Sequence, residues 1–304
     1  MGPPIDACGE VTPRSCAAGK KLLASLVWLC LAASCLAGDD YCRFKCSGGQ
    51  HTMCLFKQGA PGGKCLDYQN ASLNDKERQD ILHIHNSIRM DIANGNVNLS
   101  SHLQAADMMQ LVWDDELAAV AQVWADQCSY QHDSCRRVGR FEVGQNVAMR
   151  TGRTQFPAED MYRNIDMWFE EVEKLAPNII DEYTSSESDH FTQLAWAATG
   201  AVGCGASIYR SGEAEYTELL VCNYGPSGNR PSLPVYKTGA PCSACPQDTS
   251  CSREYQGLCF SPEYSRVTRD PPALVGAAAV ACGRALLVGV SAGLALVCGP
   301  TRRP

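Results

Sequence analysis

The sequence predicts an α+β fold in which helices and a short antiparallel sheet form layers. Apolar residues recur at helical spacing at Ile81, Ile84 and Ile88, and two further segments show the same period. Residues 202–209 and 216–224 are rich in apolar and β-branched residues and flank a polar, Gly-containing stretch, which is typical of two strands joined by a turn. At 304 residues, the chain is long enough for one or two domains with a sizeable core.

Three helices are expected before the strand pair. The first begins near Ser72 and ends at Asn94-Gly95, since glycine commonly follows a helix. The second is capped by Asp114 or the following Asp and carries an apolar stripe that starts at Leu117. The third runs from about Pro157, a favourable first-turn residue, to about Val172.

A short helix and a further strand complete the predicted elements. Asp189 is expected to cap the short helix by accepting from its first N–H groups, which places His190 in the first turn. Residues 144–149 are predicted to form the further strand. Cys204 and Cys222 lie in the two paired strands, where they are well placed for a cross-strand disulfide.

Eighteen cysteines are the strongest compositional signal. Six of them lie in or near apolar stretches at the two ends, and the remaining twelve run from Cys42 to Cys259. An even set of this kind indicates a disulfide framework made in an oxidising compartment. The net charge of −7 argues against nucleic acid as the partner, because nucleic-acid-binding surfaces are usually basic.

The two ends of the chain differ from the rest. Residues 1–38 are interpreted as a leader with a signal peptide, because two lysines precede an apolar run that is short for a membrane span. Asn70 and Asn98 each begin a glycosylation sequon, which suits a secreted protein. Residues 265–304 form an apolar tail that favours a membrane tether or a removable GPI signal, with a translated artefact as the alternative.

Four short motifs stand in order along the chain. The sequence resembles the CAP superfamily through this set, and the likeness is closest to the arthropod antigen-5 branch. Residues 126–135, which include His132, and the cysteine-rich segment from Cys42 to Cys54 are similar to that branch. The four motifs are His-Asn-Ser-Ile-Arg at 85–89, Gly-Gln-Asn-Val at 144–147, the stretch 189–199 that opens with Asp-His-Phe-Thr, and Leu-Leu-Val-Cys-Asn-Tyr-Gly-Pro at 219–226.

The resemblance implies a three-layer α-β-α sandwich with small appended modules. Residues 39–72 would be a cysteine-rich N-terminal extension, 73–230 the CAP domain, and 231–264 an extended arm with a cysteine-rich hinge. The resemblance also implies six disulfides. These are Cys42–Cys54, Cys46–Cys135, Cys65–Cys128, Cys204–Cys222, Cys242–Cys251 and Cys245–Cys259.

By the same resemblance, two histidines and two acidic residues line a central cleft. Carried over by motif, they are His85, His190, Glu171 and position 145, where this chain has Gln145. Glutamine keeps a carbonyl acceptor but lacks the charge. The cleft is expected to bind zinc or another divalent cation weakly, because neutral imidazole is a good ligand. A purely structural role for both histidines and an acid/base role are the alternatives.

The remaining four histidines are interpreted as surface or local structural residues; they are His51, His83, His102 and His132. The resemblance implies a secreted, non-enzymatic protein that binds an extracellular protein, a sterol or a lipid. The competing hypothesis is an extracellular hydrolase that depends on the cleft His and Glu residues. It is disfavoured because only one carboxylate accompanies the two histidines, and no unpaired cysteine among the twelve is left to act as a nucleophile.

Overall fold

The centre of the fold is an antiparallel hairpin of two long strands, β4 (Ala201–Arg210) and β5 (Tyr216–Gly225), in which Cys204 lies opposite Cys222. Three further strands complete a five-stranded sheet in the order β1-β4-β5-β3, with β2 pairing parallel to β4. They are β1 (Leu66–Asn70), β2 (Val112–Trp113) and β3 (Gly144–Gly152). The expected strands at 144–149, 202–209 and 216–224 are therefore all present, each slightly longer than predicted.

The computed structural model describes residues 41–99, 104–154, 156, 161–211 and 215–263. The expected signal peptide, the apolar tail and His102 lie outside these residues. Within the described ranges, no helix has the length and apolar character needed to span a bilayer.

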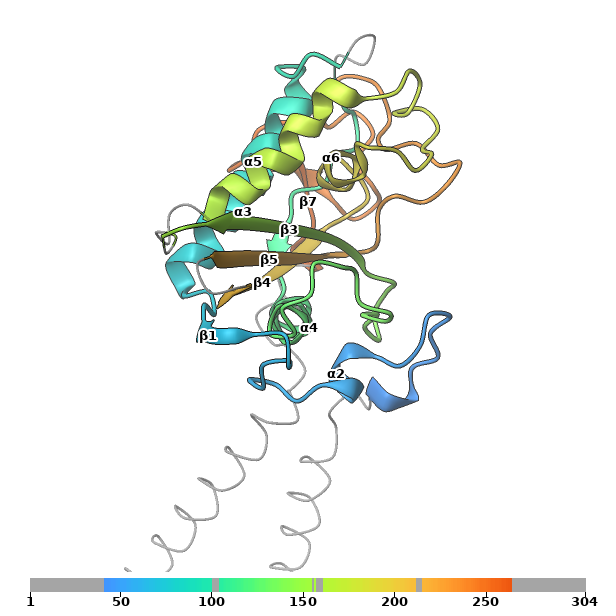
Figure 1. Cartoon of the computed structure of the whole chain (residues 1–304). Helices are drawn as coiled ribbons and strands as arrows, with labels where there is room; N and C mark the ends of the chain where they lie inside the picture. Colours follow the sequence, from blue (N-terminus) through green and yellow to red (C-terminus); the bar gives the residue numbers. More distant parts are fainter. Residues whose placement is uncertain (1–40, 100–103, 155, 157–160, 212–214, 264–304) are drawn as a thin grey trace, which may run out of the picture. The chain divides into compact units, whose positions relative to one another are not determined.

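Helices cover both faces of the sheet (Figure 1). On one face lies α4 (Asp115–Ala125), packed against β4 and β5. The other face carries three helices, α3 (Asp75–Asn94), α5 (Arg163–Glu170) and α6 (Asp189–Leu194). This helix–sheet–helix layering is the α+β sandwich that the sequence predicts.

The layer formed by α4 lies unusually close to the sheet because two glycines of β4 face it. A Cβ atom added at Gly205 would lie 2.3 Å from Cα of Gln122, and one at Gly203 would lie 2.3 Å from the backbone N of Ala118. The side chain of Gln122 also bonds the backbone N–H and C=O of Ala206, at 3.1 and 2.8 Å. Glycine at both positions therefore permits backbone-to-backbone contact between helix and sheet.

The first long helix is anchored by its caps and by one buried arginine. Asn74 and Glu77 form a capping box, and Gly95 ends α3 in the left-handed conformation at φ 77°. Arg89 is 1% exposed and donates only to backbone carbonyls. Its acceptors, at 2.8 to 3.1 Å, are those of Met109, Leu194, Trp196, Ala197 and Thr199. This arginine therefore fastens α3 to the chain that leaves α6.

The third predicted helix differs from the prediction. The described part starts in 3-10 conformation at Met161 and Tyr162, continues as α5 from Arg163, and ends in a separate 3-10 turn η3 (Glu171–Lys174). Residues 157–160, where the helix was expected to begin, are outside the described ranges. The change of helix type at Glu171 matters for the site, because it sets the direction in which this carboxylate leaves the backbone.

Six disulfides join the described cysteines, in the six pairs that the resemblance implies. They are Cys42–Cys54, Cys46–Cys135, Cys65–Cys128, Cys204–Cys222, Cys242–Cys251 and Cys245–Cys259. Two of them fasten the N-terminal extension, with η1 (Tyr41–Arg43) and α2 (Thr52–Leu55), to the loop at 128–135. The hinge, with β6 (Ser250–Cys251) and β7 (Cys259–Phe260), contacts the sandwich through hydrogen bonds of Cys259 with Met108 and Gln110.

Candidate functional site

Glu171 and His190 form the first half of the candidate site. Nδ1 of His190 lies 2.6 Å from Oε1 of Glu171, and Oε2 accepts from the backbone N–H groups of His190 and Phe191 at 3.0 and 3.2 Å. An ionised carboxylate only accepts, so Nδ1 carries a proton, and in the neutral imidazole Nε2 then holds the lone pair. The imidazole stacks on Trp168 at an interplanar angle of 18°. The His190 ring is therefore held by its inner nitrogen and one face, with its side chain 31% exposed.

The helix cap at this point differs from the prediction. Asp189 does not cap α6, because its carboxylate accepts from the Tyr183 hydroxyl, the Ser185 hydroxyl and the Ser186 N–H at 2.7 to 2.9 Å. Asp189 is itself the first residue of the helix, so its side chain reaches back to the preceding loop. Glu171 accepts from the first-turn N–H groups instead, which couples the position of His190 directly to η3.

Gln145 and His132 form the second half of the site. The Nε2 amide of Gln145 donates to Asp133 Oδ1 at 3.1 Å and to Asn223 Oδ1 at 3.0 Å. These two acceptors define the amide orientation and turn Oε1 toward His132 Nδ1, 2.8 Å away. Because Oε1 can only accept, His132 carries its proton on Nδ1, and its Nε2 keeps a lone pair. Both histidines of the site therefore have the same tautomer.

The two halves adjoin each other. Asn146 follows Gln145 on β3 and donates to the carbonyl of His190 at 3.1 Å. Residue His132 is exposed at the surface, but its ring is partly desolvated, and this desolvation is the main cause of its lowered pKa. The charges of Arg136 and His190 lower the pKa further. A lowered pKa keeps His132 neutral near pH 7, the form that can bind a metal.

The structure does not support His85 as a ligand in this cleft. Its Nδ1 bonds the Ile81 carbonyl at 2.7 Å and its Nε2 bonds the Tyr224 hydroxyl at 3.0 Å. The residue is 1% exposed, and burial lowers its pKa to about 4. Because both ring nitrogens have protein partners, His85 has no nitrogen left for a metal. Of the alternatives considered from the sequence, the structural role fits this histidine.

His132 is the cleft residue that sequence reasoning missed. It has no helical or strand periodicity around it, so its environment could not be inferred from pattern. The available signal was its position between Cys128 and Cys135, because both cysteines pair with the N-terminal extension and so fix the loop that carries His132. Its neighbour Asp133, 5% exposed, bonds Arg136 and Thr52 and holds the loop from the inside.

Comparison with known proteins identifies the family. Residues 82–224 match the model of the CAP, or cysteine-rich secretory protein, family. The chain is 42% identical over 205 residues to venom allergen 5 of Vespula maculifrons, which covers 66% of the chain and 100% of that protein. The chain therefore belongs to the CAP family, on the side of the antigen-5-like proteins, as the motifs indicate.

Two further likenesses extend the comparison. The protein CRISP/Allergen/PR-1 of Trittame loki is 37% identical over 262 residues, which cover 81% of this chain but only 62% of that relative. The chain thus spans less than two thirds of the length of that relative. Among solved structures, NaASP2 with Zn²⁺ is similar with a TM-score of 0.52 at 26% identity, covering 64% of this chain and 99% of NaASP2.

Proposed function

We propose that the protein is secreted, acts by binding rather than by catalysis, and holds a divalent cation such as zinc weakly through Nε2 of His132 and Nε2 of His190. The observation that carries the proposal is the shared tautomer of the two rings. Each Nδ1 is held by a side-chain oxygen, at 2.8 Å from Gln145 and 2.6 Å from Glu171. A hydrogen bond to one ring nitrogen is the usual way in which proteins orient the other toward a metal.

The donor set fits a weak, exchangeable ion. Two imidazole nitrogens are suitable ligands for zinc, but a closed structural zinc site has four protein ligands. Glu171 is already committed to His190 and the first turn of α6, and Gln145 is neutral. The bound cation would therefore keep open positions for water. That NaASP2, a related structure, was solved with Zn²⁺ supports this choice of probe ion.

A second group of possible ligand atoms does not fit a metal. The sulfur atoms of Cys242, Cys245 and Cys259 lie within 4.8 Å of one another. All three cysteines are in disulfides, so they offer no thiolate, the form of cysteine that binds metals. The closeness of these atoms follows from two disulfides packed together in a short hinge.

The local contacts favour binding over hydrolysis. A serine hydrolase needs its serine within hydrogen-bond reach of the histidine base. Glu171 occupies only Nδ1 of His190, and among the described residues no hydrogen bond joins a serine to this ring. The nearby Ser185 and Ser186 bond Asp189 instead. The six disulfides support secretion, because such bonds persist in oxidising compartments. Besides the cation, we propose from the family resemblance that the protein binds an extracellular protein, a sterol or a lipid.

Calorimetric titration of zinc into metal-free protein at pH 7.5 tests the proposal. We expect the His132→Ala/His190→Ala double variant to lose measurable binding and the wild type to bind. His83→Ala is the matched control, since His83 contacts Tyr255 of the hinge and takes no part in holding His132 or His190. Unchanged affinity in the double variant would refute the cleft as the metal site. A broad activity-based probe screen of the same proteins tests the non-enzymatic part.

A further inference from the structure

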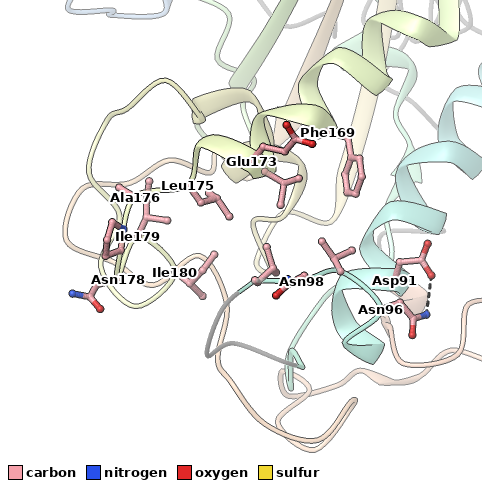
Figure 2. A pocket seen from close by; sticks show the side chains of 14 residues that line it. Asp91, Asn96, Asn98, Phe169, Glu173, Leu175, Ala176, Asn178, Ile179 and Ile180 are labelled. Atoms are coloured by element: carbon pink, nitrogen blue, oxygen red, sulfur yellow. Dashed lines mark hydrogen bonds between the residues drawn. The ribbon is translucent and has the colours of Figure 1, made fainter.

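A cavity of about 780 Å³ lies where the end of α3 meets the loop after η3 (Figure 2). This volume is within the range of sites for small organic ligands, about 300 to 1,000 Å³. Its walls come from residues 91–99 on one side and 169–180 on the other. The residues that line this cavity are not among those that hold the rings of His132 and His190.

The cavity has an apolar wall and polar residues beside it. Leu99 and Ile179 are 4% and 2% exposed and belong to the core, and Leu175 packs against the same cluster. Asn98 and Glu173 also line the cavity and are exposed. Such a surface suits a ligand with both apolar faces and hydrogen-bonding groups, which is the character of a sugar ring.

Asn98 places a modification sequon at this cavity. It heads the tripeptide Asn98-Leu99-Ser100, and the buried Leu99 fixes the backbone beside it. In Figure 2, Asn98 lies between the segment that carries Ile179 and Ile180 and the end of α3 that carries Asp91. Any group attached to the amide of Asn98 therefore starts at the wall of the cavity.

We propose that an N-linked glycan on Asn98 occupies the mouth of this cavity and controls the entry of apolar ligands. During transfer, Nδ2 of Asn98 forms a bond to C1 of the first sugar. The C1–O bond to a lipid-pyrophosphate donor of the secretory pathway breaks, and the amide proton leaves with the pyrophosphate. Apolar C–H faces of the sugar then pack on Leu175, and its hydroxyls bond Glu173. The inference rests on the secretion included in the proposed function.

A second glycosylation site, away from the cavity, provides an internal control. Asn70 heads the other sequon among the described residues and is exposed at the end of β1. It pairs with Ser207 of β4, and it is not among the residues that line the cavity. Removing a glycan from Asn70 should therefore leave the cavity unchanged.

The test compares variants secreted from animal cells. Asn98→Gln removes the attachment atom, and Ser100→Ala removes the sequon but keeps the Asn98 side chain. We expect both to bind the neutral apolar dye N-phenyl-1-naphthylamine at least tenfold more tightly than the wild type, and Asn70→Gln to match the wild type. Adding Leu175→Arg to Asn98→Gln should abolish the gain, because it places a charge in the cavity.

Glycopeptide mass spectrometry of the secreted wild type completes the test. Occupied Asn98 together with the dye results above supports the inference. An unmodified Asn98 beside a glycosylated Asn70 overturns it and leaves the proposed secretion intact. Equal dye affinity in the wild type, Asn98→Gln and Ser100→Ala also overturns it. Failure of the chain to reach the medium would instead count against the proposed function.

Discussion

Glu171 contacts both the ring and the backbone of His190, with Oε1 2.6 Å from Nδ1 and Oε2 3.0 Å from the backbone N. One carboxylate therefore orients the imidazole and satisfies the first turn of the helix that carries it. Moving either element would displace the histidine, so the geometry of the site depends on the packing of η3 against α6.

Replacing Glu171 by Gln should weaken zinc binding without removing either ligand. A glutamine has one acceptor oxygen, so it cannot accept both from Nδ1 of His190 and from the first-turn N–H groups, and the ring loses part of its orientation. Loss of such an orienting partner typically lowers metal affinity by ~10–100-fold. Calorimetric titration measures the change, and Glu173→Gln is the control because Glu173 lies two residues on and is exposed. Equal losses in the two variants would contradict the role given to Glu171.

The affinity for zinc should also fall as the pH falls. A protonated imidazole cannot bind a metal, and histidine has an ordinary pKa near 6.5. Burial lowers the pKa of His132, so at neutral pH this ring is unprotonated and its nitrogen is available to the metal. We expect a lower affinity at pH 5.5 than at pH 7.5, because protons compete with the metal for imidazole nitrogen as the pH falls through the histidine range. Titrations at the two values give the answer, and equal affinities would be inconsistent with imidazole ligands.

His85 should make the fold acid-sensitive. Burial lowers its pKa to about 4 in the folded chain, against 6.5 when unfolded. Its contribution to stability is therefore complete above pH 6.5 and is lost as the pH falls toward 4, a change of about 3 kcal/mol. Denaturant unfolding of the wild type and His85→Gln should show their stability difference narrowing by about this amount between pH 7 and 4. A difference independent of pH would disprove the assignment.

The close approach of α4 to the sheet predicts a sharp contrast between two glycines. Gly205→Ala should destabilise the fold by about 1–3 kcal/mol, the usual cost of overpacking, and the backbone of Gln122 leaves no room for a methyl group. Gly63→Ala is the matched control, because its added Cβ has no atom within 4 Å. Unfolding free energies of the two variants should therefore differ clearly, and similar values would argue against this helix–sheet contact.

Much of the fold could be predicted because its signals are local or repeated. The apolar period through Ile81 and Ile88 and the stop at Asn94-Gly95 predict α3, which ends at Asn94 with Gly95 as its cap. The two long strands are likewise recognisable from their composition. Glycine at 205, in contrast, gives no sign in the sequence of how near α4 lies, because that distance depends on tertiary packing.

The site was harder to predict because its contacts join residues far apart in the sequence. Asp189 was assigned the helix cap because it lies next to the helix, but Glu171 reaches that position from another element. His85 has a prominent motif around it and proves to be internal, while His132 comes from an irregular loop positioned by disulfides. Motif position alone therefore did not separate a buried structural histidine from a cleft histidine.

The most direct test of the metal centre is long-range ¹H–¹⁵N NMR of histidine side chains in metal-free protein, repeated after zinc is added. At pH 7.5, His132 and His190 should carry the proton on Nδ1, held by Gln145 and Glu171. Zinc should then shift the Nε2 signals of these two residues and leave those of His85 unchanged. A zinc-induced shift at His85 without one at His132 would contradict the account, as would Nε2-protonated rings at His132 and His190.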